Sequence, residues 1–506
     1  MTTLEGIFKV AKENLSAEKK RQLLAKLLAK KKQKKTQKTA QSFPLSFSQQ
    51  RLWLLHQLQP ESTAYHMPAA VRLRGTLQLD CLKRSLDALI VRHESLRTRI
   101  INDAGKAVQH IDKSLKVDLV AVFLDDPNIL AKAIETALSQ PFDLTTSPLM
   151  RVFLWKLSGH EHVLMINMHH IISDGWSMGI FISELTTLYQ AFALNRSSPL
   201  VELPIQYVDF AHWQRQQLGE TQQQQQLDYW LQQLDDVPVL DLVTDRVRPA
   251  VQSEHGKVYS FHCSSDIQQR VSSLAKQHGA TPFMVLLATF QLLLGRLSNQ
   301  TDLCVGSPVA GRSHAQTEGL IGFFVNTVVF RADLSTNATF EEFLIETRSR
   351  CLTAFDNQSL PFDQIVESLN PLRDMRYTPL FQAMLSVQNA TLPAVDLDSE
   401  LQIESLELPV KSAKFDLHLS ITESPDGYRC GLEFNSDCFD DERIVSLAEG
   451  YSRLLQAVVS QPEMTLQKFD FLSGEERQQV VNGWNQTNEP LPWVDLVAQF
   501  EQQVLR

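Results

Sequence analysis

Two adjacent histidines, His169 and His170, have the clearest chemical potential in this sequence, because Asp174 and Gly175 follow them closely. They close a dense apolar run, residues 163–170, which predicts a buried strand. Neighbours on a strand point to opposite faces, so one histidine can face a cavity while the other is tied into the protein. Histidine titrates near neutral pH and can orient or deprotonate a nucleophile, as acyl transfer to an amine requires.

The residues after the histidines predict how this turn is held. Asp174 can act as a charged partner, with an arginine as its expected counterpart, and Gly175 lets a backbone approach a ligand closely. A histidine pair can also bind a metal, but zinc needs a third ligand and HExxH spacing is absent from the sequence. The sequence also has no P-loop and no GxGxxG run. Taken alone, the pair leaves a structural and a catalytic role both open.

Helices and strands on both sides are expected to position this turn. A helix from Trp176 to about Ala193 follows it, and Asp80 is expected to cap an earlier helix. In the second half, Thr281 as N-cap and Pro282 as the first helical residue predict an apolar helix over residues 283–297. The strands predicted after that helix are residues 302–309 and 322–331.

The length and composition allow more than one hydrophobic core, since the chain has 506 residues and is 43% hydrophobic. A charged stretch with prolines, residues 235–260, is typical of a crossover between two halves. We therefore expect a mixed α/β fold with two lobes. The predicted divisions are an N-terminal segment at 1–40, lobes at 41–220 and 221–460, and a connector at 461–506.

The cysteines and the hydropathy pattern indicate the cellular compartment in which the protein is expected. The six cysteines are scattered, with no CxxC pair, which argues against a metal site or a disulfide framework and predicts buried free thiols in a reducing cytoplasm. No apolar run approaches the roughly 18 residues that a membrane span needs. The sequence therefore predicts a cytoplasmic protein that does not enter a membrane.

The net charge of −10 conceals a basic N-terminal segment. Residues 1–40 hold twelve basic and three acidic residues, a net charge of +9, and include two short amphipathic patterns followed by a lysine- and glutamine-rich stretch. The rest of the chain has no basic stripe that would extend a nucleic-acid footprint. An acidic protein partner is therefore preferred over nucleic acid, and an ordinary disordered terminus is the alternative.

The segment Met168-His-His-Ile-Ile-Ser-Asp-Gly-Trp-Ser177 resembles the HHxxxDG motif of condensation domains of nonribosomal peptide synthetases, which belong to the chloramphenicol acetyltransferase-like superfamily. Six further segments are similar to the other motifs of that family and follow the family order, although Ser48 stands where alanine is usual. They are residues 46–55, 92–98, 207–213, 321–327 with Arg331, 357–363 and 373–380. Seven motifs in order make the resemblance specific.

The resemblance implies a V-shaped pair of lobes with the HHxxxDG loop at the floor of a central tunnel. It implies peptide-bond formation between an upstream donor thioester and the amine of a downstream acceptor, each on the phosphopantetheine arm of a carrier protein. The domain itself is expected to bind no cofactor and no metal. Residues 1–40 would then dock the donor carrier's polypeptide. Residues 461–506 would lead to an adenylation domain in the same synthetase, because Trp484-Asn485-Gln486-Thr487 resembles that linker.

The resemblance also assigns site residues by position. His170 is the second histidine of the motif, close to the nucleophilic amine, whereas His169 is expected to be structural. Asp174 is expected to form an ion pair with Arg312, and Gly175 completes the catalytic motif. The residues expected to line the tunnel are Asn326, Trp176 and Ser307. The motif also resembles that of the subgroup accepting donors that end in an L-residue.

Several related functions remain as alternatives. An epimerisation domain shares the fold and the motif but inverts an α-carbon, and it usually follows a carrier domain. A heterocyclisation domain would carry aspartates in place of His169 and His170. A free-standing acyltransferase using coenzyme A would need neither the basic segment nor the trailing connector. A non-catalytic module that recruits carriers is the alternative from a different class.

Overall fold

The computed structural model describes most of the chain after the basic N-terminal segment. The predicted docking segment, residues 1–40, lies outside the part that is described. The described residues are 42–116, 119, 121–124, 126–217, 220–371, 374–388, 401–409, 411–487 and 495–506.

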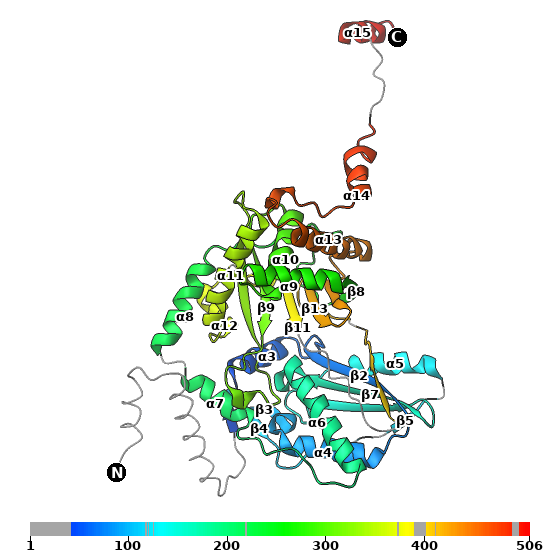
Figure 1. Cartoon of the computed structure of the whole chain (residues 1–506), viewed down its shortest axis with the longest axis vertical. Coiled ribbons are helices and arrows are strands. Elements are labelled where there is room, and N and C mark those ends of the chain that lie inside the picture. Colours follow the sequence, from blue (N-terminus) through cyan, green and yellow to red (C-terminus); the bar gives the residue numbers. More distant parts are fainter. Residues whose placement is uncertain are drawn as a thin grey trace.

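The N-terminal lobe contains a mixed five-stranded sheet with the order β12-β2-β7-β6-β5, and a smaller sheet, β1-β4-β3, beside it. In Figure 1 this lobe occupies the lower part of the molecule. The strands are β1 (Ser42–Pro44), β2 (His66–Arg74), β3 (Thr98–Asp103), β4 (Lys106–Ile111), β5 (Ala121–Phe123), β6 (Met150–Lys156), β7 (Glu161–His169) and β12 (Gln402–Leu406). The helices are α3 (Phe47–Leu58), α4 (Leu79–Arg92), α5 (Pro127–Leu138), α6 (Gly175–Ala193) and α7 (Tyr207–Gln217).

The C-terminal lobe is built on a six-stranded sheet with the order β10-β9-β11-β13-β14-β8, in which β11 runs parallel to both neighbours. The strands are β8 (Gly256–Ser264), β9 (Asp302–Val309), β10 (Asn326–Asp333), β11 (Ala383–Gln388), β13 (Leu417–Ser424) and β14 (Gly427–Asn435). The helices are α8 (Glu220–Gln233), α9 (Ser265–Gln277), α10 (Pro282–Ser298), α11 (Phe340–Asp356), α12 (Phe362–Leu369) and α13 (Asp441–Ser460).

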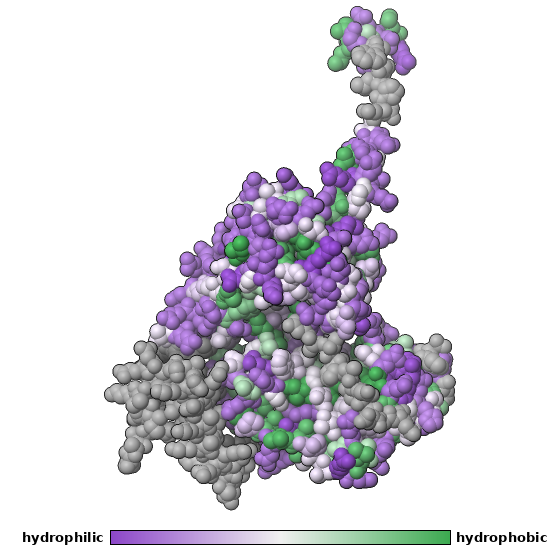
Figure 2. Space-filling view, viewed as in Figure 1, coloured by the Kyte–Doolittle hydropathy of each residue, from purple (hydrophilic) through white to green (hydrophobic). Residues whose placement is uncertain are grey.

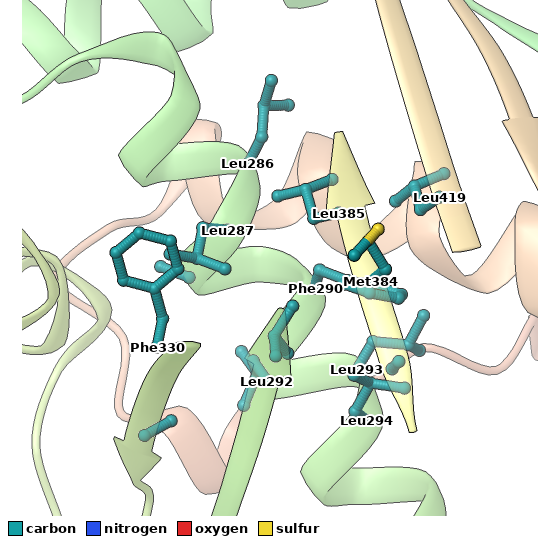
Figure 3. Packing of buried hydrophobic residues seen from close by; sticks show 14 of the residues in the cluster. Leu286, Leu287, Phe290, Leu292, Leu293, Leu294, Phe330, Met384, Leu385 and Leu419 are labelled. Carbon is teal, nitrogen blue, oxygen red and sulfur yellow. The ribbon is translucent and has the colours of Figure 1, made fainter. Parts of the chain in front are cut away.

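Each lobe has its own large hydrophobic core, which confirms the expectation of two cores. In the C-terminal lobe, α10 is the central element: residues Met284–Gly295 are all buried, and Figure 3 shows its leucines and Phe290 packed beside Met384 and Leu385 of β11. Thr281 caps this helix and Pro282 begins it, as the sequence predicts. The apolar side chains of α10 are buried, and the upper lobe in Figure 2 shows a mainly polar surface.

Two segments of the C-terminal half belong to the N-terminal lobe, so the predicted division at residue 220 is too simple. Strand β12 pairs antiparallel with β2, with Ile403 opposite Leu73. Leu320, Phe323 and Phe324 pack in the core of the N-terminal lobe. The second predicted strand therefore does not begin at residue 322: β10 begins at Asn326, after this segment has crossed to the other core.

Helix and lobe ends differ from the prediction at two other places. Asp80 does not cap α4: the N-cap is Gln78, and Asp80 lies in the first turn, where a negative charge favours the helix terminus. The C-terminal lobe continues beyond residue 460, because Leu466 and Phe469 are buried in its core and the Phe340 amide donates to Met464. Ser473 caps the short helix α14 (Gly474–Gln478).

The last described helix, α15 (Leu496–Val504), stands apart from both lobes in Figure 1. Leu496, Phe500 and Val504 on it are exposed, and Figure 2 shows apolar surface there. All six cysteines are buried and free, as expected. Among the described residues, no single helix has the length and apolarity of a membrane span; α9 and α10 meet that test only as a pair bent by 103°.

Candidate active site

The histidine pair lies where the central strand of the N-terminal lobe turns into a helix. β7 ends at His169, His170 begins a short 3-10 turn (His170–Ile172), and α6 starts at Gly175. Asp174 is the N-cap of α6, and its Oδ1 accepts a hydrogen bond from the Ser177 amide at 2.8 Å. An aspartate at this position satisfies an amide that the helix leaves free, so the chain must turn here.

His169 is tied into the protein. Its side chain is 5% exposed, and its Nδ1 accepts a hydrogen bond from the Ile171 amide at 3.1 Å. The ring meets Phe142 edge to face. Burial, with the neighbouring His66 and His170, holds the pKa of His169 well below its usual value. The ring is therefore neutral and serves to fix the 3-10 turn.

His170 has the opposite character, because its side chain is only partly buried. Its Nδ1 lies 2.9 Å from the Ser173 carbonyl oxygen, and a carbonyl can only accept, so Nδ1 carries the proton. Nε2 then keeps its lone pair, and no described residue forms a hydrogen bond with it. Phe323 packs against the ring at a centroid distance of 4.7 Å.

The surroundings of His170 keep the imidazole neutral. Burial lowers the pKa of His170 to about 3, and the positive charges of Lys414 and Arg51 act in the same direction. The His170 amide donates to the Tyr65 carbonyl at 2.9 Å, which anchors the backbone beside β2. At neutral pH the arrangement presents one proton acceptor, Nε2, from a fixed ring.

Asp174 and Arg312 join the two lobes. Arg312 Nη2 lies 3.2 Å from Asp174 Oδ1, and the two side chains are 2% and 0% exposed. Asp174 Oδ2 also accepts from the Phe324 amide at 3.0 Å. Arg312 donates to the Ser177 hydroxyl at 2.7 Å and to the Leu320 carbonyl at 2.8 Å. The pair therefore holds the crossing segment against the start of α6.

The backbone before Arg312 explains how its side chain reaches this place. Gly311 has a φ of +63°, and a Cβ there would lie 2.0 Å from the Phe324 carbonyl oxygen. Only glycine fits both conditions, and its left-handed turn lets Arg312 enter the core. The guanidinium stacks on the Phe324 ring at 4.0 Å. Burial lowers the pKa of Arg312, and Asp174 partly opposes that effect.

The other predicted site residues are spread around this centre. Gly175 is exposed, and a Cβ added to it would meet no atom of the chain within 4 Å. Trp176 is 52% exposed, with its indole N–H donating to the Glu318 carbonyl at 3.0 Å. Ser307 is buried in β9 at 3% exposure. Of the three residues predicted to line a tunnel, Trp176 alone is more than half exposed.

Asn326, the third residue predicted to line a tunnel, has its side-chain amide bonded within the chain. Its Nδ2 donates to the carbonyls of Gln358 and Leu360 at 2.8 and 2.7 Å. Its Oδ1 accepts from the Phe362 amide at 3.1 Å. The amide therefore fixes the loop before α12, because both of its N–H groups and its oxygen are bonded to the backbone.

Sequence reasoning gave several supporting residues no role. The Tyr207 hydroxyl donates to the Phe323 carbonyl at 2.6 Å and so holds the residue that packs on His170. Lys414 lies with its ammonium 4.9 Å from the Tyr65 ring centroid. Tyr207 and Arg51 stand inside matched motifs, and that position was a signal of their importance. Lys414 carries no such signal, because its place depends on how the lobes meet.

The described residues contain no metal site, and a surface cavity in the C-terminal lobe lies apart from the histidine pair. No group of three or more His, Cys, Asp or Glu side chains in that part of the chain could hold a metal ion. A surface cavity of about 300 Å³ lies between β8 and α13, lined by residues such as Tyr259, His262 and Arg453. None of the predicted site residues takes part in that cavity.

Comparisons with known proteins agree with this geometry. The sequence model described as the condensation domain matches residues 39–481. The chain is 42% identical over 453 residues to one of the linear gramicidin synthase subunits of Brevibacillus parabrevis, covering 88% of this chain and 6% of that protein. It is 36% identical over 465 residues to surfactin synthase subunit 1 of Bacillus subtilis (strain 168), covering 91% and 13%. The chain thus spans only a small part of these relatives.

Solved structures give the same fold. The X-domain in its complex with OxyB from teicoplanin biosynthesis matches with a TM-score of 0.78 and 29% identity, covering 87% of this chain and 98% of that one. The first condensation domain of the calcium-dependent antibiotic synthetase, in complex with a substrate analogue, matches with a TM-score of 0.73 and 19% identity, covering 86% and 99%. The chain therefore belongs to the condensation domain family of nonribosomal peptide synthetases, a family of amide-bond-forming acyltransferases.

Proposed function

We propose that this chain joins a donor aminoacyl or peptidyl thioester to the amine of an acceptor aminoacyl thioester, with both substrates on phosphopantetheine arms of carrier proteins. The observation that carries the proposal is the tautomer of His170. Its Nδ1–H is held by the Ser173 carbonyl, and its Nε2 lone pair remains available on a partly exposed ring. A fixed, neutral proton acceptor suits an amine nucleophile.

The reaction balances with the chain's own residues. The acceptor nitrogen attacks the donor carbonyl carbon, the C–N bond forms and the C–S bond breaks. The amine loses one proton, which His170 Nε2 accepts and returns to the departing pantetheine thiolate. The products are an amide on the acceptor carrier and a free thiol on the donor arm. His170 thus ends the cycle neutral, as it began.

The surrounding residues take supporting roles in this proposal. His169 fixes the turn, and the Asp174–Arg312 pair holds the lobes together behind it. The open space at Gly175 leaves room for a pantetheine arm to pass close to the backbone. Trp176, more than half exposed, and the buried Ser307 remain proposed wall residues of a tunnel between the lobes.

Two other functions have observations in their favour. An Nε2 lone pair could also take a proton from an α-carbon, as epimerisation requires. The similarity to an X-domain that forms a complex with OxyB favours a module that recruits another protein. Both alternatives predict that no amide bond forms between two separately loaded carriers, so one assay distinguishes them from condensation.

Incubation with a loaded donor carrier and a loaded acceptor carrier is expected to place the joined product on the acceptor, as read by mass spectrometry of the intact carrier. We expect a donor ending in an L-residue to react faster than the matched D-donor, because the motif resembles the L-accepting subgroup. Inversion of the donor's α-carbon without transfer would indicate epimerisation. Absence of both products would favour recruitment, and a preference for the D-donor would contradict the subgroup assignment.

The partners follow from the segments that flank the lobes. We propose a cytoplasmic synthetase in which residues 461–506 lead to an adenylation domain and the acceptor carrier, although residues 461–471 pack on the C-terminal lobe. The donor carrier is proposed to arrive on a separate polypeptide through residues 1–40. Their net charge of +9 suits an acidic C-terminal segment.

Deleting residues 1–35 is expected to slow transfer from a carrier on a separate protein, because exposed opposite charges steer the encounter. The effect should fade as salt rises, since the Debye length falls from about 10 Å at 0.1 M to about 3 Å at 1 M. The control is a donor carrier fused directly to the chain, whose transfer should not depend on the segment. Equal transfer by the full and shortened chains at low salt would rule out docking by this segment.

A further inference from the structure

Lys414 places a positive charge beside His170 from the opposite lobe. It lies in the segment just before β13, and its ammonium sits 4.9 Å from the centroid of the Tyr65 ring. Tyr65 belongs to the N-terminal lobe, and its carbonyl accepts the hydrogen bond of the His170 amide at 2.9 Å. Lys414 is half-buried and forms no ion pair with any described carboxylate. Its charge is therefore not cancelled by a direct partner.

The open face of the C-terminal sheet carries further polar groups close to Lys414. His418 stands opposite Glu433 on β13 and β14, and alternates with the core residues Leu417 and Leu419. It therefore points away from α10 and α13. Its Nε2 lies 2.9 Å from the Ser386 hydroxyl. Burial and the charge of Lys414 lower the pKa of His418 to about 4.

The groups that face His170 are therefore mostly cationic or neutral. Arg51 from α3 lies 3.5 Å from Asp363, and the Lys414 ammonium lies over the Tyr65 ring. Asp174 is paired with Arg312, and His169 is neutral. Burial lowers the pKa of Lys414, and the charges of Glu433 and Glu254 oppose that effect without forming an ion pair with its ammonium. Burial first, then Lys414, lowers the pKa of His170.

A positive site has a direct consequence for an amine substrate. A free α-amino group has a pKa of about 7.7 to 8.0, so near pH 7 most of it is ammonium, which has no lone pair for attack. A nearby ammonium repels that form and favours the neutral amine. The same charge attracts the oxygen that becomes negative when the thioester carbonyl is attacked.

We propose that Lys414 is a further functional residue of this site: its ammonium, held over Tyr65 across the lobe boundary, keeps the acceptor amine beside His170 in its neutral, nucleophilic form. The inference rests on the proposed function and names a residue for it. Lys414 acts through its charge on the amine and on His170, so Arg can replace it and a neutral side chain of similar length cannot.

The test compares Lys414→Met with Lys414→Arg and with Lys411→Met. Lys411 is the matched control, because it is an exposed lysine in the same segment and is paired with Glu135. Single-turnover rates at saturating acceptor carrier are measured from about pH 6 to about pH 9, since rates of the bound complex report its own titrations. A unit charge roughly 8 Å away, at an effective dielectric constant of about 20, moves such a titration by about 1.5 pH units.

Lys414→Met is expected to move the acid limb upward by about 1.5 pH units and to slow turnover near pH 7 about tenfold. In Lys414→Arg and Lys411→Met, the rate should fall at the same acidic pH as in the parent chain. A Lys414→Met profile that coincides with the Lys411→Met profile would overturn the inference. Thermal melting confirms that each variant folds, and Lys414→Gln replaces the methionine variant if that one does not.

A second measurement separates this inference from the proposed function. Titration of ¹⁵N-labelled histidines by NMR, with His170→Asn to assign the signal, reads the imidazole without any turnover. Lys414→Met should raise the pKa of His170, and Lys411→Met should leave it in place. A parent chain that forms no amide bond refutes the proposed function, whereas a His170 signal unmoved by Lys414→Met refutes the role of Lys414.

Discussion

His170→Ala is expected to leave a folded protein that has lost about 10²- to 10⁴-fold of its turnover, the usual contribution of a general acid–base group. The ring is partly exposed, and its described hydrogen bond is the one to the Ser173 carbonyl. Removing the imidazole ring therefore leaves few buried polar groups without a hydrogen-bond partner. The melting temperature should stay close to that of the parent chain. Single-turnover amide formation and thermal melting measure the two effects.

A matched pair of substitutions at this position separates proton transfer from simple positioning. In His170→Asn the side-chain amide can still donate to the Ser173 carbonyl but offers no acceptor at the place of Nε2. In His170→Gln a polar group reaches that place without the basicity of imidazole. Equal large losses for Ala, Asn and Gln would indicate proton transfer. A loss of less than about tenfold in all three would instead assign His170 to positioning an amine that is already nucleophilic.

The low pKa of His170, about 3, also fixes the sign of its pH effects. The folded protein keeps the ring neutral between about pH 3 and 6.5, where the unfolded chain takes up a proton. This histidine therefore reduces stability as the pH falls through that window. His170→Ala removes the penalty, so the variant should lose less stability than the parent chain between about pH 6.5 and about pH 4. His170 does not titrate near neutral pH. A fall in rate as the pH drops through this range would therefore report protonation of the acceptor amine.

Asp174→Ala is expected to lower the free energy of unfolding by about 3–5 kcal/mol, as for other buried pairs that lose one partner. The loss strands the Arg312 guanidinium, which is 2% exposed, and leaves the Phe324 amide without its acceptor. Arg312→Ala should cost a similar amount, because it strands the carboxylate. Urea unfolding of each variant measures these free energies.

The double variant tests whether the two residues form one unit. Because they are in direct contact, the cost of Asp174→Ala with Arg312→Ala should be less than the sum of the single costs. Arg270→Ala is the control, since Arg270 and Asp266 form an exposed pair within α9 and should contribute only about 0.3–0.5 kcal/mol. Full stability of Asp174→Ala together with unfolding of His170→Ala would reverse the roles assigned here.

The sequence alone determined the local elements around the site. Strand β9 spans residues 302–309 as predicted, and α10 begins at Pro282 behind the Thr281 cap. The helix after the motif ends at Ala193, as expected. The strand alternation also separated the two histidines, since His169 is tied to a backbone amide and His170 is partly exposed. Hydrophobic periodicity, helix caps and turn residues depend on neighbours in the chain. They can therefore be recognised from a single sequence.

Only the tertiary structure decided which of these elements meet. β12 joins the sheet of the other lobe, and the segment around Phe323 crosses to the other core. Arg312 reaches Asp174 only because Gly311 turns the chain inward, and Lys414 reaches Tyr65 only because the lobes close on each other. Such contacts join residues more than a hundred positions apart, and the periodicity of hydrophobic residues carries no information over that separation. They are fixed by how two separately packed cores fit together, and His170 lies beside residues from both sides of that boundary.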